Sequence, residues 1–533
     1  MNNLFAGPYF KIDYLNSFVG LAIGLFFVLT LIYSFKFMNP VHSKNNKDIS
    51  RMGRVKGRPR LIRYYTYITL TALASLGAVF ANDLILLLVC WGFLGLTLYL
   101  LINMGSEGSQ TVAKKTFIIV GGSDALMLLG FGIIYYLTQE LQIDKIRIGL
   151  NNGLGILAYL CIALAAFAKA GAMPMHSWIP DCAEKAPIPV VAYLPASLDK
   201  LLGIYLLARV SLDLFVMNQA MNILLMLVGA FTIVAAVMMA LVQHNMKRLL
   251  GYHAVSQVGY MVLGIGTGTP IGIAGGLFHM LNNSLYKQAL FFTAGNVEHK
   301  TGTTNLDKLG GLAKTMPLTY ISALIASLAI SGVPPFNGFV SKWMVYQGLI
   351  TQLQVASYPL RITSILCLVA AMFGSALTLA SFMKLIHATF LGQWPERPMA
   401  KGTNEVSWQM WFPPISLALI CVIFGVFATR IPLKYFIIPA VKGVTFIGTW
   451  YSDLSPLLIV LGFILGVLIF KLKGLRPQFR QDAAFVGCEA INLEKDRVSG
   501  TEFYNTIKEL GLLRALYQKA EAGAFDIYEQ GKK

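Results

Sequence analysis

Runs of about twenty apolar residues recur along nearly the whole chain, and this pattern constrains the fold more than any other feature. A run of that length crosses a hydrocarbon core of roughly 30 Å as a helix, whereas a membrane barrel needs alternating segments of about ten residues, which are absent here. Hydrophobic residues make up 56% of the chain and charged residues only 13%, against about 25% in soluble domains. The sequence therefore predicts an all-α polytopic membrane protein.

We expect about thirteen transmembrane helices. The predicted spans are 15–38, 61–81, 84–103, 116–138, 153–173, 190–210, 219–243, 250–267, 271–295, 317–345, 360–390, 412–430 and 454–472. No basic region precedes the first apolar run, and this run is long enough to stay in the membrane, so no cleavable signal peptide is expected.

The loop between the first two spans, together with the span ends that flank it (residues 36–63), carries nine basic residues against one acid, Asp48. By the positive-inside rule this loop is cytoplasmic, which places the amino terminus outside and, after thirteen crossings, the carboxyl terminus in the cytoplasm. We expect a multi-pass protein of the cytoplasmic membrane of a prokaryote. The net charge of +18 then reflects topology and contact with the headgroups of the lipid bilayer rather than a nucleic-acid partner.

Glycine and proline interrupt two apolar runs, and each interruption lies near a lysine. Lys169 precedes "AGAMP" and Lys342 follows "SGVPPFNGF"; Lys200 and Lys384 lie in the spans that come next. This recurrence predicts two inverted five-helix repeats, each with a broken helix, the arrangement in which ion sites form near the membrane midplane. The predicted organisation is 1–60 (first helix and basic loop), 61–210 and 219–390 (the two repeats), 412–472 (two further helices) and 474–533 (a polar cytoplasmic tail).

The tail contains leucines and Tyr517 at helical spacing, which favours an amphipathic helix or a partly ordered segment. The six cysteines form no C-x-x-C pair, and no two histidines are spaced i, i+4, so we expect no cofactor or metal in this chain. No phosphate-binding G-x-x-x-x-G-K-[ST] loop is present, which argues against ATP-driven transport.

Five lysines within apolar spans, Lys169, Lys200, Lys287, Lys342 and Lys384, are the candidate ion-carrying groups. A lysine at the centre of a lone membrane helix costs about 2.5–3.5 kcal/mol, so such residues usually face a partner or a wet cavity. A lysine whose surroundings alternate can bind and release a proton. The alternative is snorkelling, in which the side chain extends to the interface, and it competes most strongly for Lys287, Lys342 and Lys384.

Asp124 is the best intramembrane acid and a candidate partner for Lys169, with a structural hydrogen-bonding role as the alternative. His279 lies on the same helical face as Lys287 and is either a proton relay or a hydrogen-bonded spacer. Asp199 precedes Lys200 but points about 100° away, so these two residues do not automatically pair. His244 and His253 are expected in a solvated helix-end cluster, and His176 at a mouth of the path or in a capped loop.

Five stretches, in order along the chain, resemble the antiporter-like proton-channel subunits of respiratory complex I, membrane-bound energy-converting hydrogenases and multi-subunit cation/proton antiporters. They are "FKIDYLNSF", "FAKAGAMPMHSWIPDCAEKAPIPV", "KRLLGYHAVSQVGYM", "FHMLNNSLYKQALFFTAGNV" and "SGVPPFNGFVSKW". The resemblance implies that Lys169 and Lys342 are the channel lysines of the two broken helices, and that Lys287 and His279 belong to a central polar axis. Lys200 and Asp124 match residues found in some members.

Two departures from the family pattern concern this relay. The family usually has Trp-Glu where this chain has Trp91-Gly92, and a second histidine where it has Asn283. Either Asp124 replaces the missing glutamate, or coupling through Lys169 is altered. By this resemblance the chain begins at what would be the third helix of the family pattern. It ends in a short polar tail in place of the long lateral helix and final anchor of the largest complex I member, which favours a smaller complex of the hydrogenase type over complex I.

We therefore expect a proton- or sodium-translocating, non-redox subunit of a redox-driven complex. Its partners would be other membrane subunits and peripheral redox subunits that hold the iron–sulfur or nickel centres. The alternatives are a secondary cation/proton antiporter without redox partners and the membrane subunit of an ion-driven inorganic-carbon uptake system.

Overall fold

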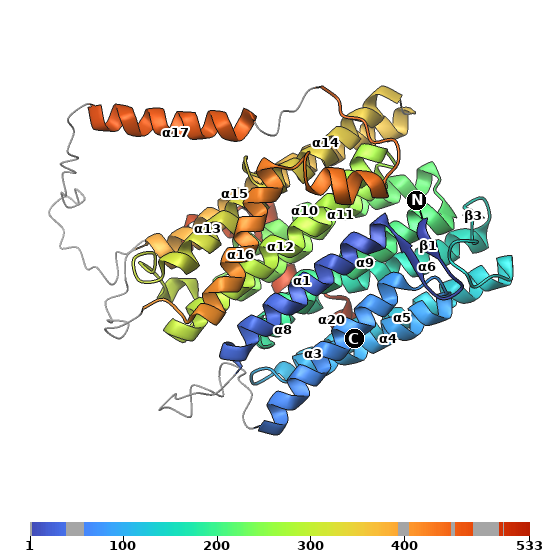
Figure 1. The fold of residues 1–533 in the computed structure, drawn as a ribbon, viewed down its shortest axis with the longest axis horizontal. Helices are drawn as coiled ribbons and strands as arrows, with labels where there is room; N and C mark the ends of the chain where they lie inside the picture. The colour runs from blue at the N-terminus through green and yellow to red at the C-terminus, as the bar shows by residue number, and fades with distance from the viewer. Residues whose placement is uncertain are drawn as a thin grey trace.

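The fold is a bundle of long helices that run roughly side by side (Figure 1). The computed structural model describes residues 3–38, 58–355, 357–392, 404–448, 454–472, 500–504 and 506–532. The basic loop that set the predicted orientation falls largely at 39–57, outside the described residues. The orientation of the termini therefore stays a prediction.

The first half of the bundle contains a short amino-terminal hairpin and the helices up to residue 214. Its elements are β1 (Asn3–Ala6), β2 (Lys11–Asp13), α1 (Tyr14–Phe37), α3 (Arg58–Phe80), α4 (Leu84–Ile102), α5 (Ser109–Thr138), β3 (Ile148–Gly149), α6 (Gly153–Ala170), α7 (Trp178–Lys185), α8 (Ile188–Tyr193), π-helical η1 (Leu194–Leu198), α9 (Asp199–Arg209) and π-helical η2 (Val210–Leu214).

The second half of the bundle contains the elements from residue 215 to residue 472. Its elements are β4 (Phe215–Val216), α10 (Gln219–Leu241), α11 (Met246–Gly266), α12 (Pro270–Thr301), η3 (Leu306–Lys308), α13 (Pro317–Ser331), α14 (Asn337–Val355), α15 (Tyr358–Ile386), η4 (His387–Leu391), α16 (Trp408–Val426), η5 (Leu433–Ile437), η6 (Ile438–Ala440) and α17 (Leu454–Leu472). The segment after residue 499 contains η7 (Glu502–Tyr504), α18 (Thr506–Glu509), α19 (Gly511–Glu521) and α20 (Ile527–Gly531).

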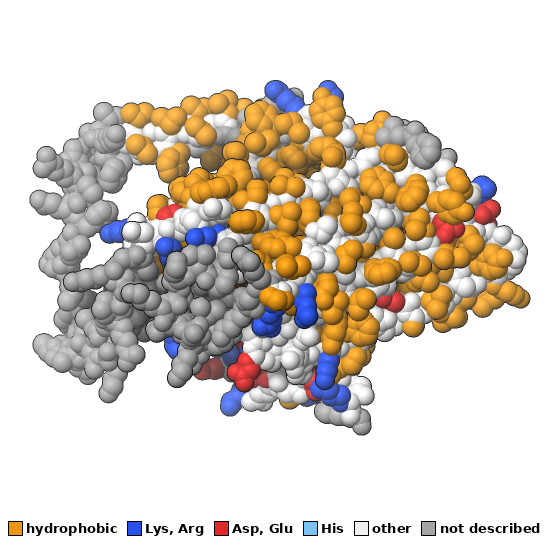
Figure 2. Space-filling model, turned by 60° about the horizontal axis from the view of Figure 1, so that its bottom comes forward, with side chains coloured by type: hydrophobic (Ala, Val, Ile, Leu, Met, Phe, Trp, Pro, Cys, Tyr) orange, Lys and Arg blue, Asp and Glu red, His pale blue; other side chains and the backbone are white. Residues whose placement is uncertain are grey.

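Eight helical stretches in the described part of the chain are long and apolar enough to cross a membrane. Hydrophobic side chains cover much of the face in Figure 2, with scattered charged side chains among them. The chain is thus a multi-pass membrane protein, while the count of thirteen crossings stays a prediction. Helix α17 lies apart from the other helices in Figure 1 with its described side chains exposed, so it needs lipid or another subunit to cover it.

Both predicted helix breaks are present, and at each of them a helix ends completely. The predicted span 153–173 ends at Ala170, and the predicted span 317–345 is two helices, α13 and α14. Gly171 (φ 81°, ψ 38°) and Gly332 (φ 80°, ψ 37°) cap α6 and α13 in nearly the same left-handed conformation. Glycine reaches this region without a Cβ clash, which explains why the helices end there.

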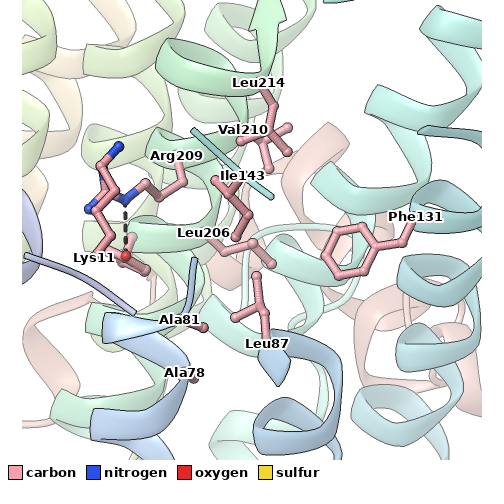
Figure 3. A pocket seen from close by; sticks show the side chains of 11 residues that line it. Lys11, Ala78, Ala81, Leu87, Phe131, Ile143, Leu206, Arg209, Val210 and Leu214 are labelled. Carbon is pink, nitrogen blue, oxygen red and sulfur yellow. Dashed lines mark hydrogen bonds between the residues drawn. The ribbon is translucent and has the colours of Figure 1, made fainter. Parts of the chain in front are cut away.

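The amino-terminal hairpin is held by a buried ionic cluster. Asp13 caps α1 and lies 2.6 Å from Arg209 of α9; Arg209 also pairs with Asp213 at 2.8 Å. Lys11 and Arg209 border a small cavity that is lined mainly by apolar side chains (Figure 3). Its volume of ≈ 10 Å³ is at the lower limit of what one water molecule needs, about 10–15 Å³. We interpret this cluster as a structural tie.

Replacing Asp13 with alanine should lower the free energy of unfolding by about 3–5 kcal/mol, because it breaks a buried ion pair and removes a helix cap. Burial disfavours the Asp13 carboxylate, but the hydrogen bond and charge of Arg209 outweigh burial and hold the pKa of Asp13 below its ordinary value of 3.8. A lowered folded-state pKa stabilises the fold above the unfolded-state pKa, and this contribution is lost as pH falls through the folded-state pKa.

Denaturant titration in detergent at pH 7 measures the loss, with the exposed Glu107→Ala as control, for which a change within about 0.5 kcal/mol is expected. An Asp13→Ala protein as stable as the wild type at pH 7 would contradict the role of the cluster.

Candidate functional site

All five lysines singled out in the sequence are buried inside the bundle. Their exposed fractions are 1% for Lys169, 0% for Lys200, 0% for Lys287, 2% for Lys342 and 1% for Lys384. A snorkelling lysine keeps its ammonium in water. The snorkelling alternative is therefore wrong for this structure, and each ammonium must find its stabilisation within the protein.

Lys169 forms a buried ion pair with Asp199. Its Nζ lies 3.3 Å from Asp199 Oδ1, and both side chains are 1% exposed. Lys169 stands in the last turn of α6, where the negative end of the helix dipole also favours an ammonium. Its Nζ lies 5.8 Å from the ring centroid of Trp91 on α4. The break after α6 thus places this lysine beside a carboxylate that begins α9.

Lys200 lies next to this pair but has no hydrogen-bond partner among the described residues. Its Nζ is 5.9 Å from the ring centroid of Trp178, and a Cβ on Gly171 would come within 3.3 Å of it. Asp199 is the charged group that acts on Lys200 most strongly. An ammonium without a direct hydrogen bond is stabilised here by the Trp178 ring and by the charge of Asp199.

Lys287, on α12, continues the row toward the second half. Its Nζ donates to the Leu250 carbonyl at 2.9 Å, and Lys200 and Lys287 interact electrostatically. His253, which we expected in a solvated cluster, is instead 0% exposed and lies within the electrostatic reach of Lys287, Lys342 and Lys384. Its Nε2 is 2.7 Å from Ser381 Oγ, and its Nδ1 has no partner in the described part of the chain. The expected interface location was wrong because α11 runs through the core of the bundle.

Lys342 and Lys384 both donate to carbonyls at the ends of helices. Lys342 Nζ donates to Ile330 O at 2.9 Å, at the end of α13, and lies 4.8 Å from the ring centroid of Tyr260. Lys384 Nζ donates to Leu241 O at 2.5 Å and to Gln243 O at 2.8 Å, where α10 ends. The final carbonyls of a helix lack partners and carry partial negative charge, so they suit a buried ammonium.

His279 is hydrogen-bonded through both ring nitrogens. Its Nδ1 lies 2.9 Å from Ser341 Oγ and its Nε2 lies 3.0 Å from Gln257 Oε1. Lys342 acts on it electrostatically, so the ring lies near the row of lysines. Asn283, where the family pattern has a second histidine, is buried, and neither polar atom of its side chain has a partner among the described residues. Both sequence interpretations of His279, relay and spacer, stay open with this geometry.

Asp124 lies close to Lys169 without being its ion-pair partner. The two groups interact electrostatically, but the carboxylate paired with Lys169 is Asp199. A Cβ on Gly95 would come within 3.4 Å of Asp124 Oδ2, whereas a Cβ on Gly92 would meet nothing within 4 Å. The side chain of a glutamate at position 92 would therefore extend from the exposed surface of α4.

The site as a whole is a row of ionisable side chains that crosses the bundle, all of them buried except the half-buried Asp124 at one end. It runs from Asp124 through Lys169, Asp199, Lys200 and Lys287 to His253, with Lys342 and Lys384 beyond. Sequence reasoning missed Asp199 as the partner of Lys169 and His253 as a member of the row. No group of three His, Cys, Asp or Glu side chains in the described ranges could hold a metal ion. A fold with two broken helices and such a row defines the class of antiporter-like membrane subunits.

The family model described as "NADH:quinone oxidoreductase/Mrp antiporter, TM" matches residues 81–389, and the chain belongs to this family. The Na(+)/H(+) antiporter subunit A1 of Staphylococcus haemolyticus is 32% identical over 395 residues, which cover 70% of this chain and 49% of the relative. The chain thus spans about half the length of the curated relatives it matches.

Among the solved structures that share the fold are chains of two membrane complexes. A chain of the membrane-bound sulfane sulfur reductase, an archaeal respiratory membrane complex, has a TM-score of 0.77 and 20% identity, with 100% of this chain and 87% of that chain covered. A chain of respiratory complex I from Thermus thermophilus has a TM-score of 0.65 and 22% identity, with 79% and 83% covered. The predicted resemblance to antiporter-like subunits is therefore confirmed.

Proposed function

We propose that this chain moves protons, or sodium ions, through the membrane as one subunit of a larger complex. The observation that carries the proposal is the Lys169–Asp199 pair, 1% exposed on both sides and located at the end of a broken helix. Burying two charges is costly, and an apolar pair of similar volume is often at least as stable, so a stabilising role alone explains this pair poorly. A role in ion movement explains both the charges and the break.

In this proposal the proton affinity of Lys169 depends on Asp199. An opposite charge at 3.3 Å favours the ammonium, whereas burial favours the neutral amine. A movement at the break that separates the two groups would release the proton toward Lys200, which has no competing hydrogen bond among the described residues. Lys287, His253, Lys342 and Lys384 would continue the path into the second half. The two inverted repeats belong to the proposal, supported by the matching conformations of Gly171 and Gly332.

Two sources of energy fit this subunit. Cation/proton antiport without redox partners is favoured by the Staphylococcus haemolyticus relative, whose name is that of an Na(+)/H(+) antiporter subunit. A redox reaction in peripheral subunits with iron–sulfur or nickel centres is favoured by the fold of the sulfane sulfur reductase chain, which covers 100% of this chain. In both cases the end of the bundle at which α1 ends and α3 begins would face the cytoplasm.

We expect a complex purified from its native membrane in mild detergent to contain further membrane subunits, and its metal content distinguishes the energy sources. Stoichiometric iron or nickel would establish the redox-driven complex. A metal-free complex that forms a Na⁺-dependent ΔpH in vesicles would establish the antiporter, and a soluble zinc-bearing partner would point to inorganic-carbon uptake. A chain that purifies alone and moves no ions would contradict the proposal.

A further inference from the structure

The segment after residue 499 folds back over one end of the bundle. We name residues 500–504 and 506–532 the strap. Tyr504 donates its hydroxyl to Ala380 O of α15 at 3.2 Å, and Tyr517, 5% exposed, donates to Met238 O of α10 at 3.0 Å. Helix α20 packs against α5. The strap therefore contacts helices of both halves of the bundle.

Asp526, just before α20, attaches the strap to the break that follows α6. Its carboxylate accepts a hydrogen bond from Ser177 Oγ at 2.8 Å and one from Lys115 Nζ of α5 at 2.5 Å. Lys115 is 6% exposed and also pairs with Asp181 of α7 at 2.7 Å. Arg248 of α11 lies 3.3 Å from Asp181. The strap, α5, α7 and α11 thus meet at the break through charged groups.

Ser177 is followed in the chain by the aromatic residue that lies against Lys200. Trp178 is 0% exposed, and its Nε1 donates to Ala168 O at 3.0 Å. Its ring centroid is 5.9 Å from Lys200 Nζ, which has no hydrogen-bond partner among the described residues. A shift of Ser177 would move Trp178 and so change the surroundings of Lys200.

Asp526 itself is a poor candidate for proton uptake at neutral pH. Burial disfavours its charged form, but the hydrogen bonds from Lys115 and Ser177 outweigh burial and hold the pKa of Asp526 below its ordinary value. The group is therefore ionised across the neutral range, and its contacts persist there. The neighbouring His176 has its pKa lowered to about 4, chiefly by burial, so it is neutral at pH 7.

We infer that Asp526 is a positioning residue of the ion pathway: through Ser177 it holds the break so that Trp178 stays against Lys200. This inference rests on the proposed function, in which Lys200 carries ions. The sequence predicted a partly ordered tail or an amphipathic helix for this segment. The inference assigns the strap a role in positioning the break.

The buried thiol of Cys182 on α7 reports on the break without any transport assay. Cys182 is 0% exposed and acts electrostatically on Lys200, and Cys421 of α16, also 0% exposed, is the internal reference. In the intact complex, Asp526→Asn should raise the rate of N-ethylmaleimide labelling at Cys182 about tenfold, because one charge-assisted hydrogen bond is worth roughly that factor in an opening equilibrium. Labelling at Cys421, followed by mass spectrometry, should not change.

The same variant should lower the rate of ion transport, and Asp526→Glu should restore both the transport rate and the protection of Cys182. Glu529→Gln is the matched control, because the Glu529 side chain is 46% exposed and pairs with Lys532, just after α20, at 2.9 Å. Wild-type labelling and transport in Asp526→Asn would overturn the inference. If this variant does not assemble, Ser177→Ala removes the same hydrogen bond, and unchanged Cys182 labelling there would overturn it equally.

Failure of the proposed function gives a different result. A wild-type complex that moves no ions would remove the role of Lys200, while Cys182 labelling would still decide whether Asp526 holds the break. Transport by the wild type with no effect of Asp526→Asn would leave the proposed function intact and refute only the role of the strap.

Discussion

Replacing Lys169 with alanine is expected to abolish ion transport by the reconstituted complex. The side chain supplies the ammonium at the end of α6, and no other basic group is paired with Asp199 within the described residues. Lys169→Arg is the sharper form of this test. An arginine can keep the ion pair with Asp199, but its guanidinium does not release a proton in proteins, so transport should also be lost.

Lys145→Ala is the control for this experiment, because Lys145 is 59% exposed and makes only a loose 4.0 Å contact with Glu140. Ion uptake into proteoliposomes measures transport, and the subunit composition of the purified complex measures assembly. A correctly assembled Lys169→Ala complex that transports at the wild-type rate would exclude Lys169 from the pathway. Loss of transport in the alanine variant with full transport in the arginine variant would show that charge, not proton release, is required.

The features that the sequence predicted best are those with a local physical cause. A run of apolar residues must lie in lipid or in a core, so the apolar spans could be predicted from composition. Glycine at a positive φ ends a helix, so the breaks at Gly171 and Gly332 could be predicted from the glycine and proline residues in these spans. The same reasoning identified the lysines, because a charge within such a run has to be compensated. What surrounds each lysine could not be predicted in this way.

Asp199 shows why. Seen along α9, it points away from its neighbour Lys200, and nothing in the sequence indicates that it faces Lys169, which precedes it by thirty residues and lies on another helix. The location of His253 was predicted wrongly for a related reason. The basic residues Lys247 and Arg248 at the start of α11 indicate a membrane interface, but they do not show that the following turns of this helix are buried in the bundle. The docking of Asp526 onto Ser177 spans 349 positions of sequence and is purely tertiary.

Asp199→Asn is expected to lower the transport rate far more than Asp124→Asn, and this comparison decides which carboxylate serves Lys169. Asp199 lies 3.3 Å from the ammonium, and removal of an opposite charge at such a distance weakens a proton-binding site by about one to three orders of magnitude. Asp124 acts on Lys169 without an ion pair, so its variant should reduce transport only modestly.

The two asparagine variants keep the size of the side chain, so a difference between them reports charge rather than packing. The Asp124→Asn/Asp199→Asn double variant should be little slower than Asp199→Asn alone, because both carboxylates are expected to act through Lys169. If Asp124→Asn proved the slower of the two, Asp124 would take the role that we assign to Asp199, and the ion pair beside the break would be structural. An equal and additive loss would instead place the two carboxylates at independent steps of one path.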